Sequence, residues 1–241
     1  MGFVLNSMTV PKTIYQTWFT KSLPLEVQST IDHMMCKNKS YTYELFDDND
    51  MESFVKNNYE QKIFDCYKKL TIGAAKADFW RYLILYKNGG VYLDVDSVIY
   101  DSIDSLVADG YSVVSREGNP NKFVQWMLIF TPEHPILKTC IDKCVQNISC
   151  GKVVDVTELT GPVVYSDSIR EVLNDSSCYY KSDEQLNQLS DKNGVMFHSF
   201  DYRGYANFEN PYKNLLYKNK VHWRNEQQMR LTRGNYYEDK C

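Results

Sequence analysis

The stretch from residue 77 to residue 97 constrains the fold of this 241-residue chain more than any other. Apolar side chains recur at roughly helical spacing over residues 74–87, and the Lys-Asn-Gly sequence of residues 87–89 is typical of a helix end. The Val-Tyr-Leu sequence of residues 91–93 is short, β-prone and wholly apolar, which predicts a strand buried on both faces. The segment therefore predicts a helix that ends at a glycine pair and leads at once into a buried strand.

Two carboxylates follow this strand directly. Asp94 and Asp96 are two residues apart just past its end, and such a pair can hold a divalent cation, which in turn holds a diphosphate. The segment thus indicates an enzyme that handles a nucleoside diphosphate, although the two aspartates can also serve only to cap a turn. On the preceding helix, Asp78 and Arg81 are three residues apart, so they share a face and can form an ion pair.

The sequence of residues 77–85, Ala-Asp-Phe-Trp-Arg-Tyr-Leu-Ile-Leu, with that of residues 89–96, Gly-Gly-Val-Tyr-Leu-Asp-Val-Asp, closely resembles the glycosyltransferases with a DXD sugar-binding motif. These are the family 32 type, which includes the yeast initiating α-mannosyltransferases and has the glucosylating clostridial toxins as distant relatives. Residues 10–18 resemble the family's opening strand, and residues 41–48 resemble its second strand. The chain departs from the family at Tyr15, where a histidine is common.

The resemblance covers most of the chain and implies its fold class. Weaker similarities lie at residues 134–137, 160–162 and 222–223. The implied fold is α/β and of the GT-A type, a single domain over residues 1–241 with a Rossmann-like nucleotide-sugar-binding core of about residues 10–200. Irregular additions at the C-terminus, residues 201–241, are expected to close over the site.

The resemblance also implies roles for four charged residues of the central segment, which are the candidate catalytic residues. Asp96 matches a metal ligand, and Asp94 matches a residue that contacts the donor's ribose or, through water, the metal. Asp78 and Arg81 match positions that hold the donor's sugar. An arginine beside a diphosphate also stabilises the leaving group through charge-assisted hydrogen bonds. Asp78, Arg81 and Asp94 are therefore candidate donor-binding residues as well.

Three further residues are candidates for contacts with the nucleotide or the metal, and each also has an explanation that involves the fold alone. Trp18 resembles the residue that stacks on the nucleobase, and the alternative is a core tryptophan at a strand end. Asp47 is expected at the edge of the nucleotide, and the alternative is a solvated acidic loop. His222 is a candidate third metal ligand that closes over the site from the C-terminal end, and the alternative is an ordinary surface or packing histidine.

The implied reaction is transfer of a hexose from a UDP-sugar or GDP-sugar to a hydroxyl group of a glycan, a lipid-linked sugar or a protein. The resemblance implies Mn²⁺ or Mg²⁺ as the cofactor and retention of the anomeric configuration. One alternative is a phosphohydrolase of the haloacid dehalogenase type, with Asp94 as nucleophile and Asp96 as acid/base, although that fold places its motif on the first strand. The other is a non-catalytic relative that binds nucleotide sugars.

Charge, cysteine content and hydropathy limit which binding partners and which cellular compartment the sequence is compatible with. The formal net charge of -4, with scattered lysines and arginines, argues against nucleic acid as the main partner. The seven cysteines show no close metal or redox spacing, so free thiols are expected, with Cys140 and Cys144 in the core. No apolar stretch predicts a signal peptide or membrane segment. We therefore expect a cytoplasmic protein, or a Golgi-lumenal one if an anchor has been removed.

Hydrophobic patterning and turn signals predict alternating strands and helices, with ligands bound beyond the carboxyl ends of the strands. Strands are predicted at residues 12–16, 41–45, 91–93, 112–115, 125–130 and 195–199. Helices are predicted at residues 25–36, within 50–70, and at 74–87, 135–147 and 161–173. This order fits an open α/β sheet.

Overall fold

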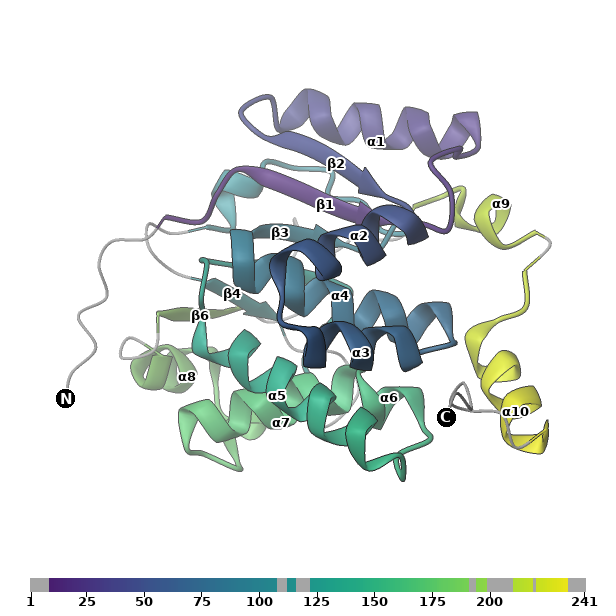
Figure 1. Cartoon of the computed structure of the whole chain (residues 1–241). Helices are drawn as coiled ribbons and strands as arrows, with labels where there is room; N and C mark the ends of the chain where they lie inside the picture. The colour runs from purple at the N-terminus through teal and green to yellow at the C-terminus, as the bar shows by residue number, and fades with distance from the viewer. Residues whose placement is uncertain are drawn as a thin grey trace.

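The computed structural model describes residues 9–107, 112–115, 122–190, 194–198, 210–218 and 220–233. A six-stranded sheet in the order β2-β1-β3-β5-β4-β6 lies at its centre (Figure 1). The strands are β1 (Thr13–Thr17), β2 (Thr42–Phe46), β3 (Gly90–Leu93), β4 (Ser112–Ser115), β5 (Met127–Phe130) and β6 (Val195–His198). Strand β5 runs antiparallel to both of its neighbours, and the other described pairs are parallel. The predicted α/β sheet is therefore confirmed, as a mixed and mostly parallel one.

Helices cover both faces of this sheet. They are α1 (Leu25–Lys37), α2 (Asp48–Asn58), α3 (Gln61–Lys69), α4 (Gly73–Asn88), α5 (Pro135–Cys150), α6 (Val156–Leu159), α7 (Pro162–Leu173), α8 (Asp183–Ser190), α9 (Lys213–Tyr217) and α10 (Trp223–Arg233), with short 3₁₀ turns at Ile103–Ser105 and Cys178–Tyr180. The predicted elements are present with boundaries shifted by three residues or fewer, and residue 199 lies outside the described residues. Helices α6, α8, α9 and α10 were not predicted, because they are short or largely polar.

Two hydrophobic cores lie on opposite faces of the sheet, because successive side chains of a strand point to opposite faces. Ile14 of β1 packs against α1 on one face, whereas Tyr15 packs in the core that α2 to α7 form on the other. The Tyr15 ring meets the ring of Phe46 edge to face at 6.1 Å. The residue that replaces the family's common histidine is thus a core tyrosine in this chain.

Helix α4 runs through the middle of the second core, between the sheet and helices α2 and α5 (Figure 1). Trp80 is fully buried, and its ring lies 4.7 Å from that of Phe46 and 5.9 Å from that of Phe54. Truncating a buried tryptophan of this kind to alanine costs about 3–5 kcal/mol. Because the helix is anchored so firmly, it fixes the position of Asp78 and Arg81, which are also buried.

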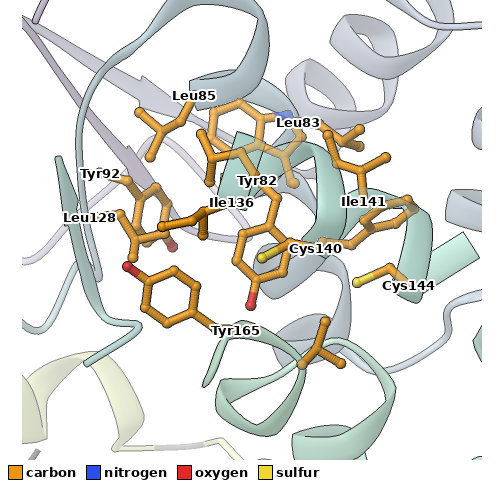
Figure 2. Close-up of a cluster of buried hydrophobic side chains, with 14 of the residues drawn as sticks. Tyr82, Leu83, Leu85, Tyr92, Leu128, Ile136, Cys140, Ile141, Cys144 and Tyr165 are labelled. Carbon is orange, nitrogen blue, oxygen red and sulfur yellow. The ribbon is translucent and has the colours of Figure 1, made fainter. Parts of the chain in front are cut away.

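Cys140 and Cys144 of α5 line this core, as predicted. Figure 2 shows Cys140 and Cys144 among tyrosine, leucine and isoleucine side chains from α4, α5, α7 and the sheet. Burial raises the pKa of the Cys140 thiol to about 12, so it stays protonated. The six described cysteines are all free thiols, and Cys241 lies outside the described residues.

A single residue, Gly89, connects α4 to β3. Its φ is 66°, and that of Gly90 is 104°, values that side-chain-bearing residues rarely adopt. A Cβ atom on Gly90 would lie 2.7 Å from the carbonyl oxygen of Thr13. The predicted glycine stop is therefore required both by the backbone conformation and by the close approach of β3 to β1.

None of the described helices is long and apolar enough to cross a membrane.

Candidate active site

The two aspartates of the motif belong to a tight turn that follows β3. The backbone N–H of Ser97 donates a hydrogen bond of 2.9 Å to the carbonyl of Asp94, which closes the turn. The side chain of Gln16 is fully buried, and its Nε2 donates to the carbonyls of both Asp94 (3.0 Å) and Ser97 (3.3 Å). Tyr43 in turn donates its hydroxyl proton to Gln16 Oε1 at 2.9 Å. The turn is thereby fixed to β1 and β2 as well as to its own strand.

Arg81 connects the helix to this turn. Its Nη2 lies 3.0 Å from Asp78 Oδ1 and 2.9 Å from Asp94 Oδ1, and its Nη1 donates to the carbonyl of Gln125 at 2.8 Å. The guanidinium carbon lies 4.5 Å from the centre of the Tyr92 ring, and the Tyr92 hydroxyl donates to Asp94 Oδ1 at 2.9 Å. The predicted Asp78–Arg81 ion pair is therefore present, and the Asp94 carboxylate joins it.

One buried cation thus faces two carboxylates, which leaves the ionised cluster with a net charge of -1. Burial raises the pKa of Asp78 to about 7, against the attraction of Arg81 and with the added repulsion of Asp94. Burial also raises the pKa of Asp94, and Arg81 opposes this rise. The carboxylates raise the pKa of Arg81 although burial disfavours its charge, so the guanidinium stays protonated. When both carboxylates are ionised, the cluster is therefore short of one positive charge.

Asp96 lies where the C-terminal part of the chain reaches the turn. Its carboxylate Oδ2 accepts a hydrogen bond of 3.2 Å from the hydroxyl of Tyr217, the last residue of α9. Its carbonyl accepts one of 2.8 Å from the backbone N–H of Asn210. The ring of Tyr217 also meets the ring of Trp18 edge to face at 5.4 Å. Part of the predicted C-terminal segment therefore lies at the site, together with the candidate base-stacking tryptophan.

An unsatisfied polar atom marks the same place. The side chain of Asn210 is 1% exposed, and its Nδ2 has no hydrogen-bond partner among the residues that the structure describes. A buried amide without a partner is costly and is usually explained by a bound group or water. With carboxylate oxygens on Asp94 and Asp96, which are ligands suited to Mg²⁺ or Mn²⁺, the residues fit a cation with a bound diphosphate.

The other two candidates occupy different positions. Asp47 is the N-cap of α2, and its Oδ1 accepts from the backbone N–H groups of Asn49 (3.0 Å) and Asp50 (2.9 Å). His222 is exposed and precedes α10, where its Nδ1 accepts from the backbone N–H of Arg224 at 3.3 Å. Over the described ranges, no three His, Cys, Asp or Glu side chains are gathered closely enough to hold a metal ion. The structure therefore does not bring His222 together with the two aspartates.

Sequence reasoning missed several residues that build the site: Gln16, Tyr92, Gln125, Asn210 and Tyr217. A glutamine in the middle of an apolar strand was the one signal for Gln16, because a buried amide must find partners. The contact of Tyr217 with Asp96 spans 121 residues, and no local pattern predicts it.

A mostly parallel sheet with two carboxylates directly after a central strand gives this chain an architecture similar to that of the GT-A glycosyltransferases. The solved structure of the "PaToxG Glycosyltransferase" superposes on it with a TM-score of 0.61 and 20% sequence identity, over 78% of this chain and 79% of that one. This similarity concerns the fold. It extends well beyond the motif, because it covers 78% of this chain.

Sequence comparison points to the same family. Residues 24–113 match the glycosyltransferase sugar-binding region containing the DXD motif, so this part of the chain is similar to the DXD-containing glycosyltransferases. This confirms the resemblance found in residues 77–85 and 89–96.

Its relatives include viral and fungal proteins. The chain is 29% identical to the uncharacterized glycosyltransferase L373 of Acanthamoeba polyphaga mimivirus, over 67% of this chain and 65% of that protein. It is 26% identical to the initiation-specific alpha-1,6-mannosyltransferase of Candida albicans, over 70% and 54%, respectively. It is 30% identical to inositol phosphoceramide mannosyltransferase 3 of Schizosaccharomyces pombe, over 55% and 36%. The matched region thus spans between about a third and two thirds of each of these relatives.

Proposed function

We propose that this protein transfers a hexose from a nucleoside diphosphate sugar to a hydroxyl group, with Mn²⁺ or Mg²⁺ bound at Asp94 and Asp96. The observation that carries the proposal is the turn after β3, in which Gln16 fixes the backbone of the two aspartates and Arg81 lies beside the first of them. The fungal relatives named as mannosyltransferases favour mannose as the sugar. The donor is then a GDP-sugar, with a UDP-sugar as the alternative.

Each residue of the site has a task in this reaction. Arg81 holds the Asp94 carboxylate ionised and oriented, and Tyr92 donates a second hydrogen bond to the same oxygen. Asp78 lies at the inner end of the cluster and orients the sugar of the donor. Trp18, at the end of β1 beside Tyr217, supplies a flat surface for the nucleobase.

When bound, the cation would supply positive charge that offsets the negative charge on the departing diphosphate. Asp94 and Asp96 would hold it, and Asn210 would donate its free amide hydrogen to a phosphate oxygen. Retention of the anomeric configuration follows from the family resemblance, and we name no general base. The acceptor is a glycan, a lipid-linked sugar or a protein hydroxyl.

The test is a donor screen with UDP-sugars and GDP-sugars, with and without Mn²⁺, in which released nucleoside diphosphate is measured. We expect slow, metal-dependent release from one donor. Asp96→Asn should abolish it and keep the fold. The matched control is Asp142→Asn, which removes a charge from an exposed ion pair with Lys138 on α5.

Two outcomes would overturn the proposal. Release of inorganic phosphate from a phosphomonoester, lost in Asp94→Asn, would identify a phosphohydrolase, although here the motif follows the third strand of the chain rather than its first. Metal-dependent nucleotide binding without turnover of any donor, with any acceptor class, would identify a non-catalytic relative.

A further inference from the structure

The segment beside the candidate site has an unusual charge for this chain. Between Glu209 and Glu226 the sequence carries four lysines and arginines and no acidic residue, in a protein whose formal net charge is -4. The four basic residues are Lys213, Lys218, Lys220 and Arg224. The described residues of this segment, 210–218 and 220–225, are called the basic strip below. It is a run of positive charge in the sequence of an acidic protein.

Large apolar side chains are exposed along the same strip. Tyr212, Leu215, Tyr217 and Val221 are all more than a third exposed. They alternate with the lysines, while Leu216 points inward and holds α9 to the core under α1. Exposed aliphatic and aromatic side chains interspersed with basic ones are typical of segments that lie in the interface of a membrane.

The strip continues onto the neighbouring loop between β1 and α1. The ammonium group of Lys220 lies 3.5 Å from the centre of the ring of Phe19, which is also exposed. Lys220 also lies close enough to Asp48, the first residue of α2, to oppose with Lys76 the rise in the pKa of Asp48 that burial causes. Lys218 is exposed and has no ion pair with any described carboxylate. The apolar and basic side chains thus form one surface from two parts of the chain.

This surface borders the candidate site. Helix α9 lies at the end of the sheet to which β1 and β2 point (Figure 1), and Tyr217 contacts both Asp96 and Trp18. A partner bound to the basic strip therefore lies next to Asp96 and the candidate active site.

We propose that the basic strip docks on an anionic phospholipid surface. Basic side chains near such a surface contribute about 1 kcal/mol each, and lysine stems lie along the apolar boundary while their charges reach the headgroups. Tyrosines are enriched at that depth. A nucleic acid would use the lysines but would leave the exposed side chains of Leu215 and Val221 without a role.

Docking would set the class of acceptor. Given the proposed transferase activity, on which this step rests, a site held against a bilayer acts on hydroxyl groups at the lipid surface, such as the headgroup of a glycolipid. The docking itself is independent of any turnover.

The test is co-sedimentation of the full chain with vesicles. We expect binding to phosphatidylcholine vesicles that contain about a third phosphatidylserine at about 50 mM salt, and its loss at about 500 mM salt or without phosphatidylserine. The variant Lys218→Glu with Lys220→Glu should weaken partitioning at least about twentyfold, because two attractions become repulsions. The matched control is Lys37→Glu with Lys39→Glu, which has the same spacing and charge change at the far end of α1. It should stay within about twofold of wild type.

A second pair of variants tests the apolar part. Leu215→Ser should weaken partitioning about fivefold, whereas Val154→Ser should not change it. The two side chains are similarly exposed, at 38% and 39%, but Val154 lies outside the strip. Absence of vesicle binding, equal effects of strip and control variants, or binding to single-stranded RNA in place of vesicles would each overturn the docking proposal. Release of nucleoside diphosphate from the donor in solution, measured on the same variants, reports on the proposed activity separately.

Discussion

Replacing Asp78 by Asn tests how one buried cation shared by two carboxylates affects stability. Arg81 contacts both Asp78 and Asp94 at about 3 Å, and the Asp78 side chain is 10% exposed. Burial raises the pKa of Asp78 from 3.8 to about 7, because the attraction of Arg81, which also faces Asp94, does not offset the loss of hydration and the repulsion of Asp94. An asparagine has the same shape, still accepts from Arg81, and does not titrate.

The sign of the effect follows from proton linkage. Between pH 3.8, where Asp78 titrates in the unfolded chain, and about pH 7, the native protein binds one more proton than the unfolded protein. The free energy of unfolding contributed by Asp78 therefore falls as pH rises, by about 1.4 kcal/mol per pH unit. From pH 3.8 to about pH 7, wild type therefore loses roughly 4 kcal/mol of its free energy of unfolding through Asp78. Asp78→Asn has no titrating group at this position and does not lose this stability.

The assay is urea unfolding of the metal-free protein, with a chelator present, from about pH 5 to pH 8. We expect the stability of Asp78→Asn relative to wild type to rise by about 3 kcal/mol between pH 5 and pH 8, with most of the rise below pH 7. Asp142→Asn, in an exposed pair on α5, is the control and should follow wild type throughout. A constant difference between Asp78→Asn and wild type across the range would refute the shared-cation explanation.

Three other substitutions or probes test separate features. Gln16→Ala removes the donor to the carbonyls of Asp94 and Ser97 and should lower the free energy of unfolding in urea by about 1–3 kcal/mol. It should also weaken Mn²⁺-dependent nucleotide binding. An unchanged Mn²⁺ affinity would mean that the turn keeps its conformation without the Gln16 side chain. Trp18→Ala should weaken binding of the nucleoside diphosphate by about 1–3 kcal/mol in calorimetry. Unchanged affinity would limit Trp18 to packing against Tyr217. At about pH 8 a thiol reagent should label exposed Cys36 at once and Cys140 only after unfolding, as peptide mapping would show, and fast labelling of Cys140 would contradict its burial.

Local patterns predicted the centre of the site because its parts are close in the sequence. The helical spacing of Asp78 and Arg81 and the apolar strand before Asp94 are properties of short segments. Their meeting required only that the helix lead into the strand through one residue. The exposed histidine at 222 shows the limit of this reasoning, since a residue type suited to metal binding gives no information on where the fold places it.

The remainder depends on contacts that no short segment encodes. Asp47 was expected at the nucleotide, whereas its carboxylate caps α2, and the acidic residue three positions on was the signal for a capping box. Tyr217 and Asn210 reach Asp96 from a part of the chain that follows the last strand, where the sequence shows no regular hydrophobic period. Such contacts arise from the packing of the whole domain.

The one-residue connection at Gly89 fixes the position of α4 relative to β3. Arg81 and Asp94 stand on either side of it, thirteen positions apart in the sequence, and their contact depends on that count. One inserted residue would turn the helix by about 100° relative to the strand and carry Arg81 away from the carboxylate. This part of the protein can therefore vary by exchange of residues but not by a change of length, so insertions have to enter elsewhere in the chain.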